Sequence, residues 1–328
     1  MSVEDIKSIT AQPYRVRGVL PARGLAAIYG ASGSGKSFLA MDLAFSLANG
    51  RASWFGLALR EAPVVYVALE GQGGLQRRVL AWEAHNQLLH PHNVVFKDSN
   101  FSLCTDGDAS ELAREVTDLF PFGCVIFIDT LNQAAPGADE NGSSDMGVIL
   151  SSAQRLSREA NALVILIHHS GKDRSKGMRG HSSLFAAMDA VIEVTSSASG
   201  RSWCVSKAKD DQTGTSHNFA LVAYSVGTDI DGFELRSCAV EPTFNPPTLR
   251  AKPLMGKHQK AAFGRLSELF DGPSSSITWD NAVAEVASSL SCGGSRRTTI
   301  AKETLERLIE NGHFTLSDGA LKLQGSIN

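Results

Sequence analysis

The segment GASGSGKS at residues 30–37 constrains this chain more than any other part of its sequence. It fits the pattern G-x-x-x-x-G-K-[ST] without a mismatch, through Gly30, Gly35, Lys36 and Ser37. Glycines let the backbone curl so that successive N–H groups point inward and form an anion-binding nest. A helix that begins directly afterwards presents its unpaired N–H groups and its positive dipole end to the same anion. Such a loop predicts the binding of a nucleoside triphosphate.

The flanking sequence supplies the strand and the helix that this motif requires. The apolar run LAAIY precedes the loop, and KSFLAMDLAFSLA after it has apolar residues at helical spacing. The Lys36 ammonium is expected to reach the β- and γ-phosphates, and the Ser37 hydroxyl to ligate Mg²⁺. The predicted cofactors are ATP and Mg²⁺, and the predicted binding residues are Gly30, Ala31, Ser32, Gly33, Ser34, Gly35, Lys36, Ser37 and Phe38.

Length and charge limit the remaining choices. The 328 residues allow one large α/β domain plus a smaller one. The formal net charge is −3, so no overall basic field attracts nucleic acid, and such binding needs a local patch or an assembly. Five cysteines without C-x-x-C spacing suit a reducing cytoplasm, which is the predicted location. No apolar run approaches the roughly 18 residues of a membrane span, so no membrane partner is expected.

Apolar strands alternate with helices up to about residue 188. Strands are predicted within APVVYVALEG, NVVFK, GCVIFIDT and ALVILIHHS, and helices at LQRRVLAWEAHNQLL, DASELAREVTDLF and SDMGVILSSAQRLSREA. Asp108 is expected to cap the second of these helices. Strands that are apolar on both faces and alternate with helices predict an α/β fold, with a mostly parallel sheet covered by helices on both faces.

The pattern changes in the last part of the chain. Four β-type stretches with Gly, Ser and Asp turns follow residue 188 and predict a meander. The Pro-rich stretch EPTFNPPTLRAKP reads as a linker, and three helices with a terminal β-hairpin follow it, as in a winged helix. We therefore predict an ATPase core at residues 1–241, a linker at 242–253 and a small winged-helix-like domain at 254–328.

Two acids stand at the carboxyl ends of different predicted strands. Asp129 ends VIFID, where it could hold Mg²⁺ through water opposite Ser37. Thr130 follows it instead of a second acid, so the group that orients the attacking water must come from elsewhere. Glu70 ends VVYVALE, and strand ends line the ligand crevice of such sheets. Glu70 is thus the predicted catalytic carboxylate, and the alternative is an ordinary strand-end acid that meets solvent.

A histidine pair and a basic loop follow the next strand. His168 and His169 stand at its tip, and a polar group there can touch the γ-phosphate and shift the loop with nucleotide state. A structural pair and zinc ligands are the alternatives for the histidines, and a solvated surface is the alternative for the loop. The predicted DNA-binding residues of the loop are Lys172, Arg174, Lys176 and Arg179.

Together these positions resemble the RecA-like hexameric helicases, especially the RepA type of plasmids and phages. The resemblance covers about residues 14–240, and the phrases EGQGGLQRRVLAW and DTLNQAAPGADENGSSDMG add to it. It implies a RecA-like P-loop NTPase in which Lys36 holds phosphate, Glu70 is catalytic, Asp129 holds magnesium and His169 senses the γ-phosphate. It further implies a hexameric ring, single-stranded DNA bound by loops at 134–145 and 170–182, and a replication initiator or primase as a partner.

The resemblance gives a role to a second basic pair. Lys207 and Lys209 alternate in VSKAK, so both side chains point to one face of a strand. In RecA-like rings a Lys/Arg pair on such a strand reaches the γ-phosphate of the neighbouring subunit, and the resemblance makes both lysines catalytic in trans. Ring helicases more often carry an arginine there. The alternative is a pair of lysines that protects an edge strand from aggregation.

Three classes of function remain open at this level. The first is an ATP-driven motor on single-stranded DNA, which the resemblance favours. The second is a non-motor ATPase of the same fold, either a recombination or repair filament or a switch or loader that recruits a replication protein. The third is a small-molecule kinase, for which no substrate motif is evident. The terminal domain could bind duplex DNA through Arg296, Arg297 and Lys302, or dock a protein.

Overall fold

The computed structural model divides the chain into two compact units, Met1–Pro247 and Thr248–Asn328. Each unit is described by itself. The residues that the structure describes are 13–88, 93–97, 101–171, 178–197, 200–209, 211–249, 254, 256–270, 276–290, 296–311, 313–317 and 319–323. No helix among them combines the length and the apolar character needed to cross a membrane.

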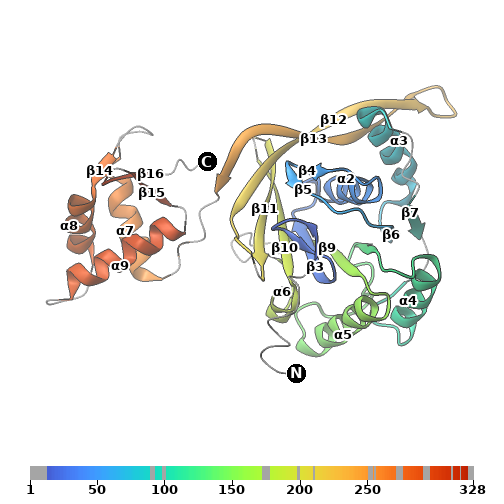
Figure 1. Ribbon diagram of the computed structural model, residues 1–328, viewed down its shortest axis with the longest axis horizontal. Coiled ribbons are helices and arrows are strands. Elements are labelled where there is room, and N and C mark those ends of the chain that lie inside the picture. The colour runs from blue at the N-terminus through green and yellow to red at the C-terminus, as the bar shows by residue number, and fades with distance from the viewer. Residues whose placement is uncertain are drawn as a thin grey trace. The chain divides into compact units, whose positions relative to one another are not determined.

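The first unit is organised around a nine-stranded sheet with the order β13-β12-β11-β10-β3-β9-β8-β6-β7 (Figure 1). From β10 to β7, each strand is parallel to its neighbours, whereas β11 is antiparallel to both β10 and β12. The strands are β3 (Gly24–Gly30), β6 (Val64–Ala68), β7 (Val94–Lys97), β8 (Val125–Asp129), β9 (Leu163–His169), β10 (Ala190–Ser197), β11 (Gly200–Ala208), β12 (Thr215–Thr228) and β13 (Glu234–Leu249).

Helices cover both faces of this sheet, because its central strands are buried on both sides. The helices are α2 (Lys36–Ala48), α3 (Leu75–Asn86), α4 (Asp108–Leu119), α5 (Ser143–Glu159) and α6 (Ser182–Ala187). One apolar cluster joins α2 to one face, and a second joins α4 and α5 to the other, as Figure 1 shows. The predicted α/β RecA-like fold, with a mostly parallel central sheet between helices, is thus confirmed.

Short elements complete the first unit and were not resolved by sequence patterns. They are β1 (Tyr14–Val16), β2 (Leu20–Pro21), β4 (Ser53–Trp54), β5 (Leu57–Ala58), the 3-10 helix η1 (Gln72–Gly74) and α6. The prediction that Asp108 caps α4 was wrong. Gly107 occupies the cap position, and Asp108 is the first helical residue, whose carboxylate accepts a hydrogen bond from the Ser102 N–H at 3.0 Å.

The predicted linker also differs from the structure. Strand β13 continues to Leu249, through most of the Pro-rich stretch that was expected to be irregular. Prolines lack a backbone donor but tolerate an edge strand, and β13 is the last strand of the sheet. Residues 250–253 lie outside the described part of the chain, and the domain boundaries remain a prediction.

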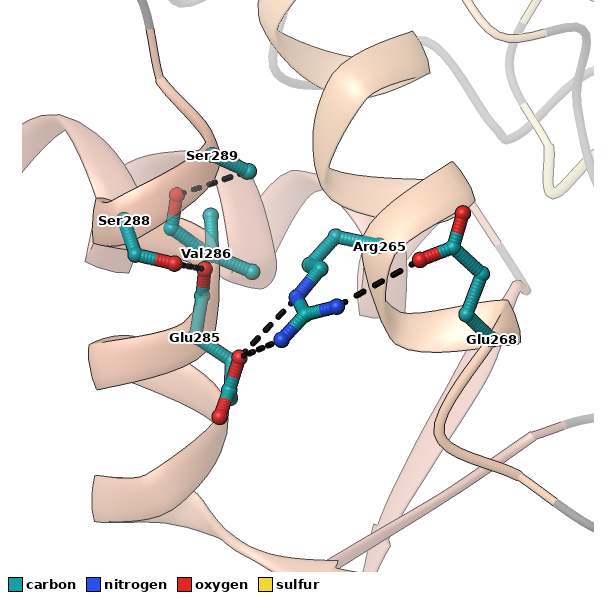
Figure 2. A network of polar contacts seen from close by, with 6 residues as sticks. All are labelled: Arg265, Glu268, Glu285, Val286, Ser288 and Ser289. Carbon is teal, nitrogen blue, oxygen red and sulfur yellow. Dashed lines mark hydrogen bonds and ion pairs between the residues drawn. The ribbon is translucent and has the colours of Figure 1, made fainter.

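The second unit packs three helices against a small sheet. Its elements are α7 (Lys257–Ser267), β14 (Ser276–Thr278), α8 (Trp279–Ser289), α9 (Arg297–Glu310), β15 (Phe314–Ser317) and β16 (Ala320–Leu323), with the strand order β14-β16-β15. Leu266, Val286, Leu305 and Phe314 lie in its core. Figure 2 shows Arg265 of α7 paired with Glu285 of α8 at 2.8 Å and with Glu268 at 3.4 Å. The helices and the hairpin lie where the sequence predicts them, and β14 was not expected.

Candidate nucleotide site

The loop between β3 and α2 has the backbone geometry that its glycines permit. Gly33 and Gly35 have φ values of +76° and +97°, a region that favours glycine. The strand β10 closes over the start of the loop, since a Cβ on Gly30 would lie 2.3 Å from the Val194 carbonyl oxygen. The Ser34 Oγ is buried and has no hydrogen-bond partner among the described residues. These features fit a nest that waits for an anion.

The buried Lys36 side chain sits among acids. Burial lowers its pKa, and the charges of Asp129 and then Glu70 oppose that effect. The two carboxylates therefore act on the same ammonium, although they belong to different strand ends. This arrangement brings together three of the residues that the sequence selected.

Asp129 is a buried carboxylate held by two hydroxyl groups. The Ser37 hydroxyl donates to its Oδ1 at 3.3 Å, and the Tyr66 hydroxyl donates to its Oδ2 at 2.7 Å. Burial raises the pKa of Asp129, while the hydrogen bonds from Tyr66 and Ser37 lower it. A serine hydroxyl beside a carboxylate is an oxygen donor set that suits Mg²⁺. The residues present therefore fit the metal that ATP brings with it.

Glu70 is anchored to the same strand end through its backbone and its side chain. The Leu69 and Glu70 N–H groups both donate to the Asp129 carbonyl oxygen, at 2.8 and 3.2 Å. The Thr130 hydroxyl donates to Glu70 Oε2 at 3.2 Å. Glu70 is exposed, so its carboxylate can meet a water molecule. Thr130, which stands where a second acid was absent, thus positions the acid of the neighbouring strand.

The two histidines at the end of β9 differ in their surroundings. His168 is fully buried, and its Nε2–H donates to the Arg179 carbonyl oxygen at 2.9 Å. His169 is partly exposed, and its pKa is lowered by burial and next by the charge of Lys36. A neutral His169 therefore lies within the electrostatic reach of Lys36 and Glu70. His168 has a structural role, while His169 occupies the position expected of the sensor.

The basic loop is described only at its end. Lys172, Arg174 and Lys176 lie outside the described residues. Arg179 Nε lies 2.9 Å from Glu140 Oε2, where the Arg179 side chain is 52% exposed and that of Glu140 only 6%. The Asn132 amide donates to the other Glu140 oxygen at 2.7 Å. Arg179 thus neutralises a buried acid, and its predicted contact with DNA has to compete with that pair.

Lys207 and Lys209 lie away from the phosphate loop of their own chain. Lys207 pairs with Val191 in β10, which is level with Ala27 in the middle of β3. Its Nζ donates to the carbonyl oxygens of residues 185 and 186 at 2.9 and 2.8 Å, near the end of α6. Lys209 Nζ lies 3.3 Å from Asp189 Oδ1. Both lysines therefore have partners within the chain, and a role in a neighbouring site stays a prediction.

Sequence reasoning missed the roles of four residues at this edge: Tyr66, Thr130, Arg78 and Arg201. Arg78 of α3 stacks over Phe38, with its Cζ 5.1 Å from the ring centroid, and its charge lowers the pKa of Asp129. Tyr66 is the only aromatic residue of an otherwise aliphatic strand, a signal that could have been noticed. The other three carry no sequence signal for these roles, because only the fold brings them here.

Comparisons with known proteins agree with this geometry. A family model described as "AAA domain" matches residues 2–175, and no curated protein matches significantly. One similar solved structure, the ATPase domain of a helicase, has 15% identity and a TM-score of 0.47, covering 60% of this chain and 81% of that one. Another, "Crystal structure of the RadB recombinase", has 20% identity and a TM-score of 0.46, covering 61% and 89%. At these TM-scores neither likeness supports a conclusion about this chain.

The family match has more weight than the two structural likenesses. It spans more than half of the 328 residues and includes the phosphate loop, Glu70 and Asp129. The class uses ATP with Mg²⁺ generally, which agrees with the donor set at Ser37 and Asp129. The chain therefore belongs to the AAA domain family and is a RecA-like ATPase.

Proposed function

We propose that this ATPase is a motor on single-stranded DNA, a RepA-like helicase that assembles into a hexameric ring with ATP at each subunit interface. In this proposal the phosphate loop and Lys36 hold the triphosphate, while Ser37 and Asp129 hold Mg²⁺. The metal, when bound, neutralises charge on the phosphates. Glu70, fixed by Thr130, orients the attacking water in line with the γ-phosphate.

The observation that carries the motor proposal is the attachment of the basic loop to the nucleotide edge. The Arg179 N–H donates to the His169 carbonyl oxygen at 3.1 Å, and His168 donates to the Arg179 carbonyl oxygen. The end of the loop is therefore bonded to both histidines at the tip of β9. A change in the charge that His169 meets can act on the loop directly, which is what coupling of hydrolysis to DNA requires.

The charge balance supports an assembly. A net charge of −3 gives one chain little attraction for DNA, whereas six short basic loops that meet in one channel would attract the DNA backbone. Contacts of this kind are mostly to phosphates, so binding should show little sequence preference and strong salt sensitivity. A replication initiator or a primase is the proposed further partner. The second unit, with exposed Arg296, Arg297 and Lys302 at the start of α9, could contact duplex DNA or such a protein.

A specific observation favours the second candidate, a non-motor ATPase such as a loader or a filament. Lys207 and Lys209 are the residues proposed to act in trans, yet each is bonded within its own chain. A chain that keeps these partners would leave the neighbouring site without its cation. The motor therefore requires Lys207 to exchange its carbonyl partners for a phosphate when the ring forms.

One experiment separates the two candidates. The protein is sized in ATP-γ-S, and ATP hydrolysis is measured with and without single-stranded DNA. The motor predicts a six-fold assembly and DNA-stimulated hydrolysis, both weakened by Lys207→Ala. Arg236→Ala serves as the control, because Arg236 is exposed and paired with the nearby Glu234. A monomer indifferent to DNA would support a switch or loader, and open filaments would support recombination.

A further inference from the structure

Arg201 lies at the nucleotide edge of the sheet. It is the second residue of β11, where it pairs with Ser196 of β10 on one side and Phe219 of β12 on the other. Two residues before Ser196, Val194 of β10 pairs with Gly30, the first residue of the phosphate loop. Arg201 is thus level with the loop itself, at the opposite end of β11 from Lys207.

The side chain of Arg201 packs on the phosphate loop. A Cβ added to Gly35 would lie 3.4 Å from Arg201 Cδ, and 3.5 Å from both Phe219 and Leu221. These distances place the stem of the arginine and two apolar side chains against the residue that precedes Lys36. The contact is made within one chain, so it does not depend on a neighbouring subunit.

The charge of Arg201 is not neutralised by the part of the chain that the structure describes. Its Nε is buried and has no hydrogen-bond partner there, although the residue as a whole is partly exposed. Buried donors are nearly always paired in native proteins, and an unpaired charged donor is costly. Such a group calls for a ligand, and the phosphate loop beside it binds one.

The order of the strands decides which part of ATP comes near. Asp129, Glu70 and His169 lie at the ends of β8, β6 and β9, which are all on one side of β3. The metal and the attacking water belong at that side, so the γ-phosphate points there. The nucleoside therefore extends toward the other side of β3, where β10 and β11 lie.

We propose that Arg201 binds the nucleoside end of ATP in cis, with its guanidinium stacked on the base. A planar guanidinium stacks on aromatic faces, and this cation is attracted by their π electrons. Phe219 and Leu221 supply the apolar wall that such sites usually have. The inference rests on ATP binding at the phosphate loop, which is one part of the proposed function, and it does not require DNA or a ring.

The test compares the binding of Mg²⁺-ATP and Mg²⁺-tripolyphosphate, which lacks a nucleoside, by calorimetry on the full chain. Arg201→Ala should weaken ATP binding about tenfold, or about 1.4 kcal/mol, and leave tripolyphosphate binding unchanged. Arg201→Lys should lose nearly as much, because an ammonium has no plane to stack, and it serves if the alanine variant does not fold. Arg236→Ala is the matched control and should change neither ligand.

Three results would overturn the proposal, and they are distinguishable. Equal weakening of ATP and tripolyphosphate by Arg201→Ala would mean that the arginine contacts phosphate. Unchanged ATP binding in that variant, with binding lost in Lys36→Ala, would remove Arg201 from the site and leave the phosphate loop in place. Unchanged ATP binding in Lys36→Ala would show that the loop does not bind the nucleotide, and the proposed function would fail with the inference.

Discussion

Two buried aspartates, Asp42 and Asp129, have similar exposure and different surroundings. Asp42 is 5% exposed and Asp129 is 3% exposed, and burial raises the pKa of each. The indole N–H groups of Trp54 and Trp82 donate to Asp42 at 2.9 and 3.0 Å. Asp129 instead accepts from two hydroxyls, one of them at the open phosphate loop.

The difference lies in whether a partner can be exchanged. An indole N–H has no acceptor capacity, so the two tryptophans can only donate to Asp42 and cannot share a cation with it. The Ser37 hydroxyl can turn its lone pair to a metal that Asp129 also holds. A basic side chain acts on each acid, Arg51 on Asp42 and Lys36 on Asp129. Burial, two donors and a nearby cation therefore do not identify a functional acid, whereas an exchangeable donor at the phosphate loop does.

The largest expected effect is that of Asp129→Asn on hydrolysis. Removing the carboxylate charge should lower Mg²⁺-dependent ATP turnover about a thousandfold, since the site loses a ligand that acts on transition-state charge. Asp42→Asn is the matched control, because it removes the same charge from the other buried site and should keep turnover near wild type. Steady-state ATPase assays measure both variants, and an equal fall in the two would contradict the distinction between the acids.

The next effect concerns stability and reverses the order of the two sites. Asp42→Ala leaves two buried indole N–H groups unpaired, at about 1–3 kcal/mol each. The free energy of unfolding should therefore fall by about 2–4 kcal/mol, as measured by urea denaturation. Asp129→Ala should cost less, since the Ser37 hydroxyl can turn to solvent. A larger loss for Asp129→Ala would contradict the assignment of Asp42 as the structural acid.

A smaller effect is expected for the residue that holds Asp129. Tyr66→Phe removes one hydrogen bond from the carboxylate and should weaken the apparent Mg²⁺ affinity about tenfold to a hundredfold. Trp82→Phe removes one hydrogen bond from Asp42 in the same way. It should leave the Mg²⁺ titration of ATPase activity unchanged. Identical Mg²⁺ curves for Tyr66→Phe and wild type would show that the Tyr66 hydroxyl does not support the metal site.

The smallest effect is a pH dependence. Because burial raises the folded-state pKa of Asp42 above its unfolded value, its contribution to stability is fully present below about pH 4 and is lost as pH rises through the folded-state pKa. The free energy of unfolding of wild type, relative to Asp42→Asn, should fall over that range and then level off. Urea denaturation of both proteins across a pH series measures it. A difference that rises with pH would have the wrong sign.

The contrast between local patterns and tertiary contacts explains what the sequence could reveal. Asp129 was found because a strand-end acid after a phosphate loop is a local pattern, and the same holds for Glu70. Tyr66 and Thr130 contact these acids through the pairing of β6 with β8, which no local pattern encodes. Arg201 reaches the loop only because β10 joins β3, although the loop and β11 are far apart in the sequence.

The strands and helices of the core followed from apolar periodicity, whereas the short elements lacked enough length for a pattern. The ion pair of Arg179 with Glu140 could not be foreseen either, because both residues looked like loop charges. Their pairing depends on two loops that approach closely. Gly180 allows this approach, since a Cβ there would lie 3.1 Å from the Glu140 carbonyl oxygen.

The central claim is that three neighbouring strand ends gather around one triphosphate, with Glu70 aiming the water. Glu70→Gln tests it most directly, through ATP binding and single-turnover hydrolysis measured on the same preparation. The account predicts that ATP still binds and that hydrolysis falls at least about a hundredfold. Hydrolysis near the wild-type rate would remove Glu70 from the reaction and contradict the account.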